Sequence, residues 1–146
     1  MRKIGLDVGD NTIGIAISDP LCITAQGITT LERVGIRKDA GKVIDLIREY
    51  GCDEVVIGLP LNLYGGDSAQ TGKVREFKTM LENKMRSTGM QDIGISWQDE
   101  RLTTVQAEKV MIEADVSRKK RKEVIDKQAA TIILQTFLDT GGNTLK

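Results

Sequence analysis

Two acidic residues stand at positions where an ionised side chain costs free energy. Asp7 interrupts an apolar, strand-like run, and Asp126 continues a helical stripe formed by Ala130, Ile133 and Phe137. A carboxylate in such a position needs an opposite charge or a bound cation, because burial penalises its charge. The alternative is ordinary local bonding, to a turn for Asp7 and to the positive end of a helix for Asp126.

The residues around Asp7 favour a bound cation or another ligand at this position. Residues two apart in a strand share a face, so Asp7 lies between Gly5 and Gly9 on its own side. Glycines in a strand often mark the close approach of a ligand or of another backbone. The pattern therefore predicts room for a ligand or a metal ion above Asp7.

A third acidic position, Asp99–Glu100, directly follows the alternating run at residues 93–97. Ligands of open α/β sheets bind beyond the carboxyl ends of the strands. Alternation places Asp99 on the Trp97 face and Glu100 on the opposite face, so we expect only one of them in a site. Capping of the next helix and an ion pair with Arg101 are the alternative roles.

The chemistry open to these acids is limited by the rest of the composition. The chain has no histidine, which excludes a Ser–His or Cys–His pair and histidine ligation of a metal. Cys22 and Cys52 are far apart, so a zinc site is not expected. Carboxylates are suited to Mg²⁺ or Mn²⁺, and two such ions can clamp the attacking water and the leaving oxygen of a phosphodiester.

Two further segments are candidates for contact with a nucleic acid. The first is an unbroken basic run, expected as a loop before the last helix: Arg118, Lys119, Lys120, Arg121 and Lys122. Such a run can hold a phosphate backbone, or it can simply be a solvated charged segment. The second is Asn62, in a loop at residues 58–65 that is either a phosphate-binding loop or a strand-to-helix connection.

Length and charge describe a single globular domain. The chain has 146 residues, with 21 basic and 21 acidic side chains. We expect one domain at residues 1–139 and a frayed tail at residues 140–146. The sequence shows neither a signal peptide nor an apolar run long enough to span a bilayer, so a cytoplasmic protein is expected. A net charge of zero predicts modest affinity for naked nucleic acid.

Hydrophobic periodicity predicts the elements that must position the acids. Strands are expected at residues 4–8, 12–18, 23–31, 54–58 and 93–97, and helices at residues 36–50, 74–88, 103–114 and 123–138. The order is β-β-β-α-β-α-β-α-α. A meander followed by alternating strands and helices is typical of the α/β class, with a mixed sheet covered by helices.

Four segments in this order closely resemble the YqgF (RuvX) family of pre-16S rRNA nucleases. They are IGLDVG at residues 4–9, VIGLPLN at residues 56–62, DERLTT at residues 99–104 and VIDKQAA at residues 124–130. The second and third, at this spacing, are highly specific, and the resemblance spans about residues 2–139. It implies a ribonuclease-H-like fold, with a five-stranded mixed sheet and helices on both faces.

The resemblance also implies an activity and its residues. The expected activity is a metal-dependent endonuclease that trims precursor 16S ribosomal RNA during ribosome maturation, with Mg²⁺ or Mn²⁺ as cofactor. The implied acids are Asp7, Glu100 (or Asp99) and Asp126. Gln98 stands where some members carry histidine. Contact with the nucleic acid is expected from Asn62, Arg101 and the basic run at residues 118–122, on precursor rRNA that is naked or within a ribosomal particle, by a monomer or a homodimer.

Three other functions stay open at this point. The shared fold allows a resolvase of Holliday junctions, that is, of branched DNA. The balanced charge allows a non-catalytic RNA- or ribosome-binding assembly factor. The stretch from Asp7 to Thr12 also resembles the first phosphate loop of actin-like ATPases and sugar kinases, although 146 residues leave no room for their second lobe.

Overall fold

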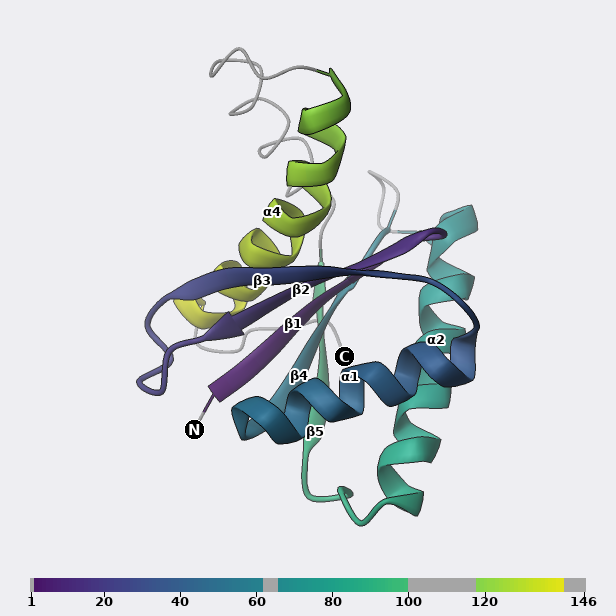
Figure 1. Ribbon diagram of the computed structural model, residues 1–146, viewed down its shortest axis with the longest axis vertical. Helices are drawn as coiled ribbons and strands as arrows, with labels where there is room; N and C mark the ends of the chain where they lie inside the picture. Colours follow the sequence, from purple (N-terminus) through teal and green to yellow (C-terminus); the bar gives the residue numbers. More distant parts are fainter. Residues whose placement is uncertain (1, 62–65, 100–117, 141–146) are drawn as a thin grey trace.

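One mixed sheet organises the chain. The computed structural model describes residues 2–61, 66–99 and 118–140, with side chains described from residue 128 onward in the last range. Its strands and helices are β1 (Arg2–Val8), β2 (Thr12–Ser18), β3 (Ala25–Glu32), α1 (Ile36–Tyr50), β4 (Cys52–Leu59), α2 (Ala69–Ser87), β5 (Gly94–Asp99) and α4 (Arg118–Asp139) (Figure 1). The strand order is β3-β2-β1-β4-β5, which puts β1 at the centre.

The predicted order of elements is confirmed wherever the structure describes the chain. β1, β2 and β3 form an antiparallel meander, and β4 and β5 pair parallel to β1. The helix expected at residues 103–114 and most of the tail lie outside the described residues. None of the described helices is long and apolar enough to cross a membrane.

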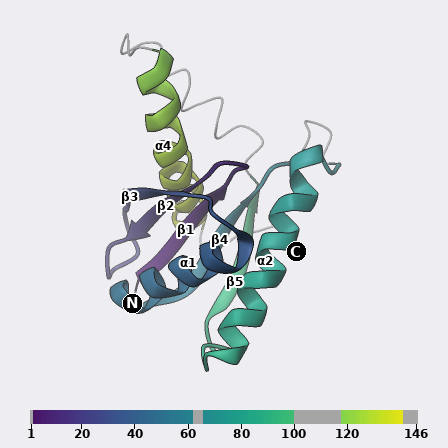
Figure 2. The ribbon, with the colours of Figure 1, turned by 45° about the vertical axis from the view of Figure 1, so that its right-hand side comes forward.

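Helices cover both faces of the sheet, as expected. α1 and α2 lie on one side and α4 on the other (Figure 2). α1 stops at Tyr50, capped as predicted by Gly51, whose φ of 65° favours glycine. α2 begins earlier than expected because Ser68 and Thr71 form a capping box, with the Ser68 N–H donating to Thr71 Oγ1 at 2.8 Å.

The basic run is helical, which corrects the expectation of a loop. α4 begins at Arg118 and not near Glu123. The prediction placed the helix start where its apolar stripe begins. A helix needs no apolar face in a turn that projects beyond the sheet, and Lys and Arg are good helix formers. The five basic residues therefore occupy the first turns of α4.

The third strand also starts later than expected, at Ala25. The reason is a tight loop held by Asp19, whose carboxylate accepts N–H bonds from Leu21, Ile23 and Thr24 at 3.2, 2.7 and 2.8 Å. Asparagine and aspartate side chains commonly stabilise turns in this way. The loop leaves Leu21 and Ile23 exposed although both are apolar.

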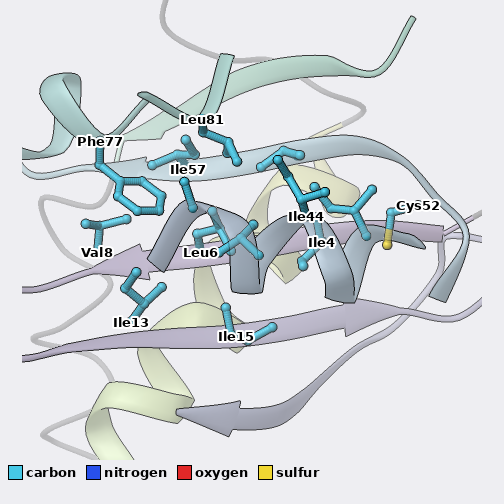
Figure 3. Close-up of a cluster of buried hydrophobic side chains, with 14 of the residues drawn as sticks. Ile4, Leu6, Val8, Ile13, Ile15, Ile44, Cys52, Ile57, Phe77 and Leu81 are labelled. Atoms are coloured by element: carbon cyan, nitrogen blue, oxygen red, sulfur yellow. The ribbon is translucent and has the colours of Figure 1, made fainter. Parts of the chain in front are cut away.

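The main hydrophobic core lies between the sheet and the α1–α2 layer. β1, β2 and β4 contribute alternate aliphatic residues, and Ile44 of α1 and Phe77 and Leu81 of α2 close over them (Figure 3). Large side chains on this face keep the two helices at a distance from the strands.

The second core, beneath α4, combines small residues of the sheet with a buried stripe of the helix. Ala16 and Val56 of the sheet meet Ala130, Leu134 and other buried residues of the helix. A Cβ atom at Gly5 would lie 2.8 Å from Leu134 Cβ and 3.2 Å from the Ala130 carbonyl oxygen. The helix therefore packs closely on the central strand, and Gly5 is the residue that permits it. The described part of the predicted stripe of α4, which is Ala130, Ile133 and Phe137, is buried here.

Candidate functional site

Asp7 lies on the central strand, near its carboxyl end, on the side that faces α4. Strand pairing sets it opposite Gly14 of β2. On its other flank, Leu6 pairs with Ile57 of β4, so the next residue, Gly58, is level with Asp7. Asp7 is half-buried. Its lateral neighbours on both adjacent strands thus carry no side chain.

The two glycines on the Asp7 strand do not make the room that was predicted for them. The space above Gly5 is filled by α4. A Cβ atom at Gly9 would lie 3.1 Å from the Thr12 carbonyl oxygen, and the Gly9 N–H donates to that oxygen at 2.8 Å. Gly9 therefore serves the turn between β1 and β2. Any space beside Asp7 comes from glycines on the neighbouring strands, which local sequence spacing could not reveal.

The turn that follows Asp7 is held from the opposite face of the sheet. Arg33 donates from Nη1 to the Gly9 carbonyl at 2.9 Å and from Nε to Asp39 Oδ2 at 2.9 Å. The Arg33 guanidinium also lies 5.4 Å from the centre of the Phe77 ring. This buried ion pair fixes the backbone just beyond Asp7. Sequence reasoning missed it, although an acid in the first turn of α1 is a usual helix-start signal.

Asp39 remains ionised in this setting although its side chain is only 2% exposed. Burial opposes the charge, but the Val34 N–H, at 3.0 Å from Oδ1, and the Arg33 guanidinium outweigh that opposition. The pKa of Asp39 is therefore lower than usual. The pair acts as a fixed support for the turn.

Asp10, at the tip of the same turn, is exposed and paired with α2. Its Oδ1 accepts bonds from Lys73 at 3.1 Å and Gln70 at 3.3 Å, and the Lys73 bond is the main cause of its lowered pKa. A pocket of about 330 Å³ lies beside it, and its charged lining residues are Asp10, Arg33, Asp39, Lys73 and Glu76. Acids and bases alternate in this pocket, so no single sign of ligand charge is favoured.

Asp99 and Asp7 lie on opposite faces of the sheet. The row Leu6–Ile57–Trp97 faces α1 and α2, and Asp99 shares its side because it is two residues from Trp97. Asp7, next to Leu6, faces α4. The sheet therefore does not bring these two acids together. Glu100 and Arg101 lie outside the described residues.

Gln98 shares the Asp7 side of the sheet. It pairs with Gly58, so Asp7, Gly58 and Gln98 form one row across three parallel strands. Its Oε1 atom is buried and has no hydrogen-bond partner among the described residues.

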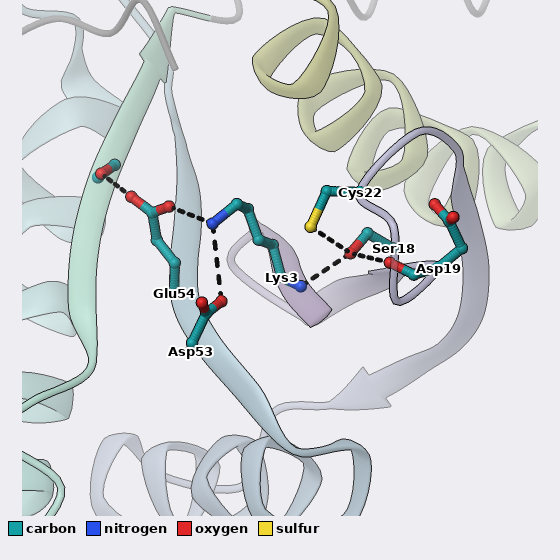
Figure 4. A network of polar contacts seen from close by, with 7 residues as sticks. Lys3, Ser18, Asp19, Cys22, Asp53 and Glu54 are labelled. Atoms are coloured by element: carbon teal, nitrogen blue, oxygen red, sulfur yellow. Dashed lines mark hydrogen bonds and ion pairs between the residues drawn. The ribbon is translucent and has the colours of Figure 1, made fainter. Parts of the chain in front are cut away.

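The opposite end of the same sheet side holds a polar network (Figure 4). Lys3 Nζ lies 2.8 Å from Glu54 Oε1 and 3.6 Å from Asp53 Oδ1. Glu54 Oε2 accepts a bond from Ser96 Oγ at 2.6 Å, and the Lys3 N–H donates to Ser18 Oγ at 2.8 Å. Burial lowers the pKa of Lys3, but the Glu54 hydrogen bond and charge outweigh it and raise the pKa overall.

The remaining predicted residues can be placed only by backbone or not at all. Asp126 lies in α4, one turn before Ala130, and its side chain is outside the described residues. The same holds for the side chains of residues 118–122. Asn62 is outside the described residues altogether.

The described donors on the Asp7 side are oxygens, the kind of donor that a divalent cation prefers. Within residues 2–61, 66–99 and 128–140, no group of three His, Cys, Asp or Glu residues could hold a metal. The described donors at this end are the Asp7 carboxylate and the orphaned Oε1 of Gln98, both of them oxygens, beside glycines. Oxygen donors match Mg²⁺ and Mn²⁺, so the Asp7 row supplies the right chemistry for part of a coordination shell.

Comparisons with known proteins agree with this picture. Residues 1–140 match the family model described as "RuvX: Holliday junction resolvase". The chain is 48% identical over 141 residues to a protein of Desulforamulus reducens named "Putative pre-16S rRNA nuclease", covering 97% of this chain and 98% of that one. A protein of the same name in Clostridium tetani is 50% identical over 140 residues, covering 96% and 97%.

Solved structures show the same fold. The Thermus thermophilus RuvC in complex with a Holliday junction substrate superposes with a TM-score of 0.59 at 11% identity, covering 99% of this chain and 98% of that one. The fowlpox virus Holliday junction resolvase gives 0.56 at 13% identity, covering 96% and 99%. The predicted ribonuclease-H-like fold is thus confirmed.

Proposed function

The chain belongs to the RuvX family, and on this premise we propose that it is a divalent-cation-dependent endonuclease acting on precursor 16S ribosomal RNA. The names of relatives nearly half identical over nearly the whole chain support the substrate. The observation that carries the chemistry is the placement of Asp7. It lies on the central strand, near its carboxyl end, level with glycines on both neighbouring strands.

The path of α4 supports Asp126 as the second acid. Gln135 binds the β2–β3 loop, accepting the Ala25 N–H at 2.8 Å, at the Lys3 end of the sheet. One turn and more before it, Ala130 lies over Gly5. Continuing the helix one turn further carries Asp126 toward the Asp7 end, because each turn advances about 5.4 Å.

Glu100 is the third acid of the proposal, and strand alternation is its support. Gln98 lies on the Asp7 side and Asp99 on the other. If alternation persists for one more residue, position 100 returns to the Asp7 side. We therefore assign Glu100, rather than Asp99, to the site.

The proposed mechanism assigns a separate task to each part of this end of the sheet. Asp7, Glu100 and Asp126 would hold Mg²⁺ or Mn²⁺, which when bound lowers the pKa of water and offsets charge on a phosphodiester. The Arg33–Asp39 pair keeps the backbone beyond Asp7 in place. The close contact of Gly5 with α4 fixes the helix that carries Asp126.

Binding of the RNA backbone is assigned to the basic first turns of α4, at residues 118–122, with Asn62 and Arg101 as further contacts. In support, α4 begins with these five consecutive cationic residues, several turns before the residues that contact Gly5. Cationic side chains bind phosphates with little regard to sequence. We place the activity in the cytoplasm, on precursor rRNA that is naked or within a ribosomal particle, with a monomer or homodimer as the acting species.

The proposal is tested by incubating the wild type and Asp126→Asn with labelled precursor 16S rRNA, in Mn²⁺, Mg²⁺ or EDTA. We expect cleavage by the wild type with either cation, none in EDTA, and none by the variant. A four-way DNA junction is the competing substrate, because the family description names Holliday junctions. Cleavage of the junction alone would replace RNA with branched DNA. RNA binding without cleavage, with ribosomal particles supplied, would favour an assembly factor.

A further inference from the structure

A groove of about 380 Å³ lies between α1 and α2. The two helices approach closely here, since a Cβ atom at Gly41 of α1 would lie 3.7 Å from Lys84 Nζ of α2. The residues that line the groove are Arg37 of α1 and, from α2, Met80, Asn83, Lys84 and Ser87. Two of these side chains are cationic and none is acidic, so the groove carries a net positive charge.

The two cations of the groove form no ion pair within the described part of the chain. Other cations of α2 do, and their pairs are Lys73 with Asp10, Arg75 with Asp67 and Lys78 with Glu82. The pocket beside Asp10 also differs, because acids and bases alternate in its lining. Two like charges that line one groove repel each other, which opposes folding unless an anion lies between them.

Helix stability does not explain why both cations line this groove. Arg37 lies in the first turn of α1, where the helix dipole favours acidic side chains and opposes cationic ones. Lys84 lies in the last turn of α2, where the dipole favours a cation, but Arg86 has the same advantage outside the groove. The shared position of Arg37 and Lys84 therefore points to a bound anion.

We propose that the groove between α1 and α2 binds phosphates of the RNA backbone, as a second contact remote from the cleaved bond. This inference rests on the proposed function. A guanidinium group presents a planar set of N–H donors that fits two oxygens of a phosphate, and an ammonium group adds a compact positive charge. The Asn83 amide supplies a further donor, and no carboxylate in the lining repels the anion.

The groove and Asp7 lie on opposite sides of the sheet. α1 and α2 cover one face, whereas Asp7 lies on the face that α4 covers (Figure 2). Arg37 is near the end of α1 that is closer to Asp7, because Arg33, just before the helix, bonds the Gly9 carbonyl. The RNA segment in the groove is therefore not the segment at Asp7. We expect the groove to contribute to affinity and not to the rate of cleavage at saturating RNA.

The test measures binding of a precursor 16S rRNA fragment in EDTA, over a range of salt concentrations, to the double variant Arg37→Gln/Lys84→Gln. We expect affinity to fall about tenfold at low salt, and the slope of log affinity against log salt to become shallower by about one to two. DNA of the same sequence should lose affinity by a similar factor, because it carries the same phosphates.

The matched control is Lys38→Gln/Arg86→Gln, which removes the same charge. Each of its cations lies in the same turn of the same helix as its counterpart and is exposed, but neither lines the groove. We expect the control to keep the wild-type salt slope. Lys84→Met, which keeps the apolar stem of the side chain, should lose as much affinity as Lys84→Gln, because the charge and not the stem binds the phosphate.

Several results would overturn the inference. An unchanged salt slope in Arg37→Gln/Lys84→Gln, or an equal change in the control, would mean that no phosphate is bound in the groove, and would leave an acidic protein segment as its occupant. A loss of affinity in Lys84→Gln but not in Lys84→Met would assign Lys84 to packing. A lower cleavage rate at saturating RNA would place the groove in the catalytic centre. A wild type that binds RNA in EDTA but never cleaves it with a cation would overturn the proposed function and not the phosphate contact.

Discussion

At the amino end of β1, the side of the sheet facing α4 carries Lys3, whose ammonium group is paired with Glu54 and Asp53. At the carboxyl end of the same strand, the same side carries Asp7, level with Gly58 and with Gln98, whose Oε1 has no hydrogen-bond partner among the described residues. The two ends share strands, helix cover and pairing. They differ in what the neighbouring strand places beside a polar group. At the Lys3 end it places a polar side chain, and at the Asp7 end it places a glycine.

This difference separates polar residues that stabilise the fold from polar residues that are available to a ligand. The Lys3 network stabilises the sheet, since the Lys3, Glu54 and Ser96 side chains bond one another across three strands. At the Asp7 end, the buried Oε1 of Gln98 has no hydrogen-bond partner among the described residues, which costs stability and is retained where a ligand completes it. Charge alone does not distinguish the two ends, because both contain acids. The residue on the neighbouring strand distinguishes them.

The largest effect is expected from Asp7→Asn. The variant removes a charged oxygen donor from the proposed cation site while keeping the shape of the side chain. Cleavage of precursor rRNA should fall by more than ~100-fold, because even partners outside a metal's own ligands cost ~10–100-fold. Glu54→Gln, at the other end of the face, is the control, and its cleavage rate should stay within about twofold of the wild type. Equal losses of cleavage rate in the two variants would contradict the proposed difference between the two ends of the sheet.

A smaller effect is expected where α4 rests on the sheet. Gly5→Ala places a methyl group 2.8 Å from Leu134 Cβ, so the helix must shift. Overpacking of this kind costs about 1–3 kcal/mol of unfolding free energy, measurable by denaturant titration. Gly72→Ala is the control, because nothing lies within 4 Å of its added Cβ and α2 should gain about 0.5–1 kcal/mol. A neutral Gly5→Ala would contradict the tight packing.

The smallest effect concerns the pair behind the Asp7 turn and is visible through pH. Asp39 has a lowered pKa in the folded state, so its charge stabilises the fold above its ordinary titration range. That contribution is lost as pH falls through the folded pKa. The unfolding free energy of the wild type should exceed that of Asp39→Asn by about 1–2 kcal/mol near pH 7 and converge with it below pH ~4. A difference independent of pH would exclude an ionised Asp39.

Much of the fold follows from local pattern. The alternation in β1 and β2 and the helical stripe of α1 ending at Gly51 predict those elements correctly. Such features depend on residues close in the chain, and period-two or helical spacing captures them.

Other features depend on contacts between distant segments, and local spacing did not reveal them. Gly5 looked like space for a ligand, but the space belongs to Leu134, far along the chain. Likewise, the row of Asp7, Gly58 and Gln98 exists only once three strands are in register. The basic run was misjudged for another reason: helix propensity sustained a helix where the apolar stripe had not yet begun.

The most direct test of the account is Mn²⁺ binding followed by electron paramagnetic resonance, on the wild type, Asp7→Asn and Glu54→Gln. The account predicts that Asp7→Asn weakens binding at least ~10-fold, because Asp7 supplies a donor to the cation. It predicts wild-type binding for Glu54→Gln, whose carboxylate is already engaged by Lys3 and Ser96. Wild-type affinity in Asp7→Asn, or a loss confined to Glu54→Gln, would place the cation elsewhere and contradict the central claim.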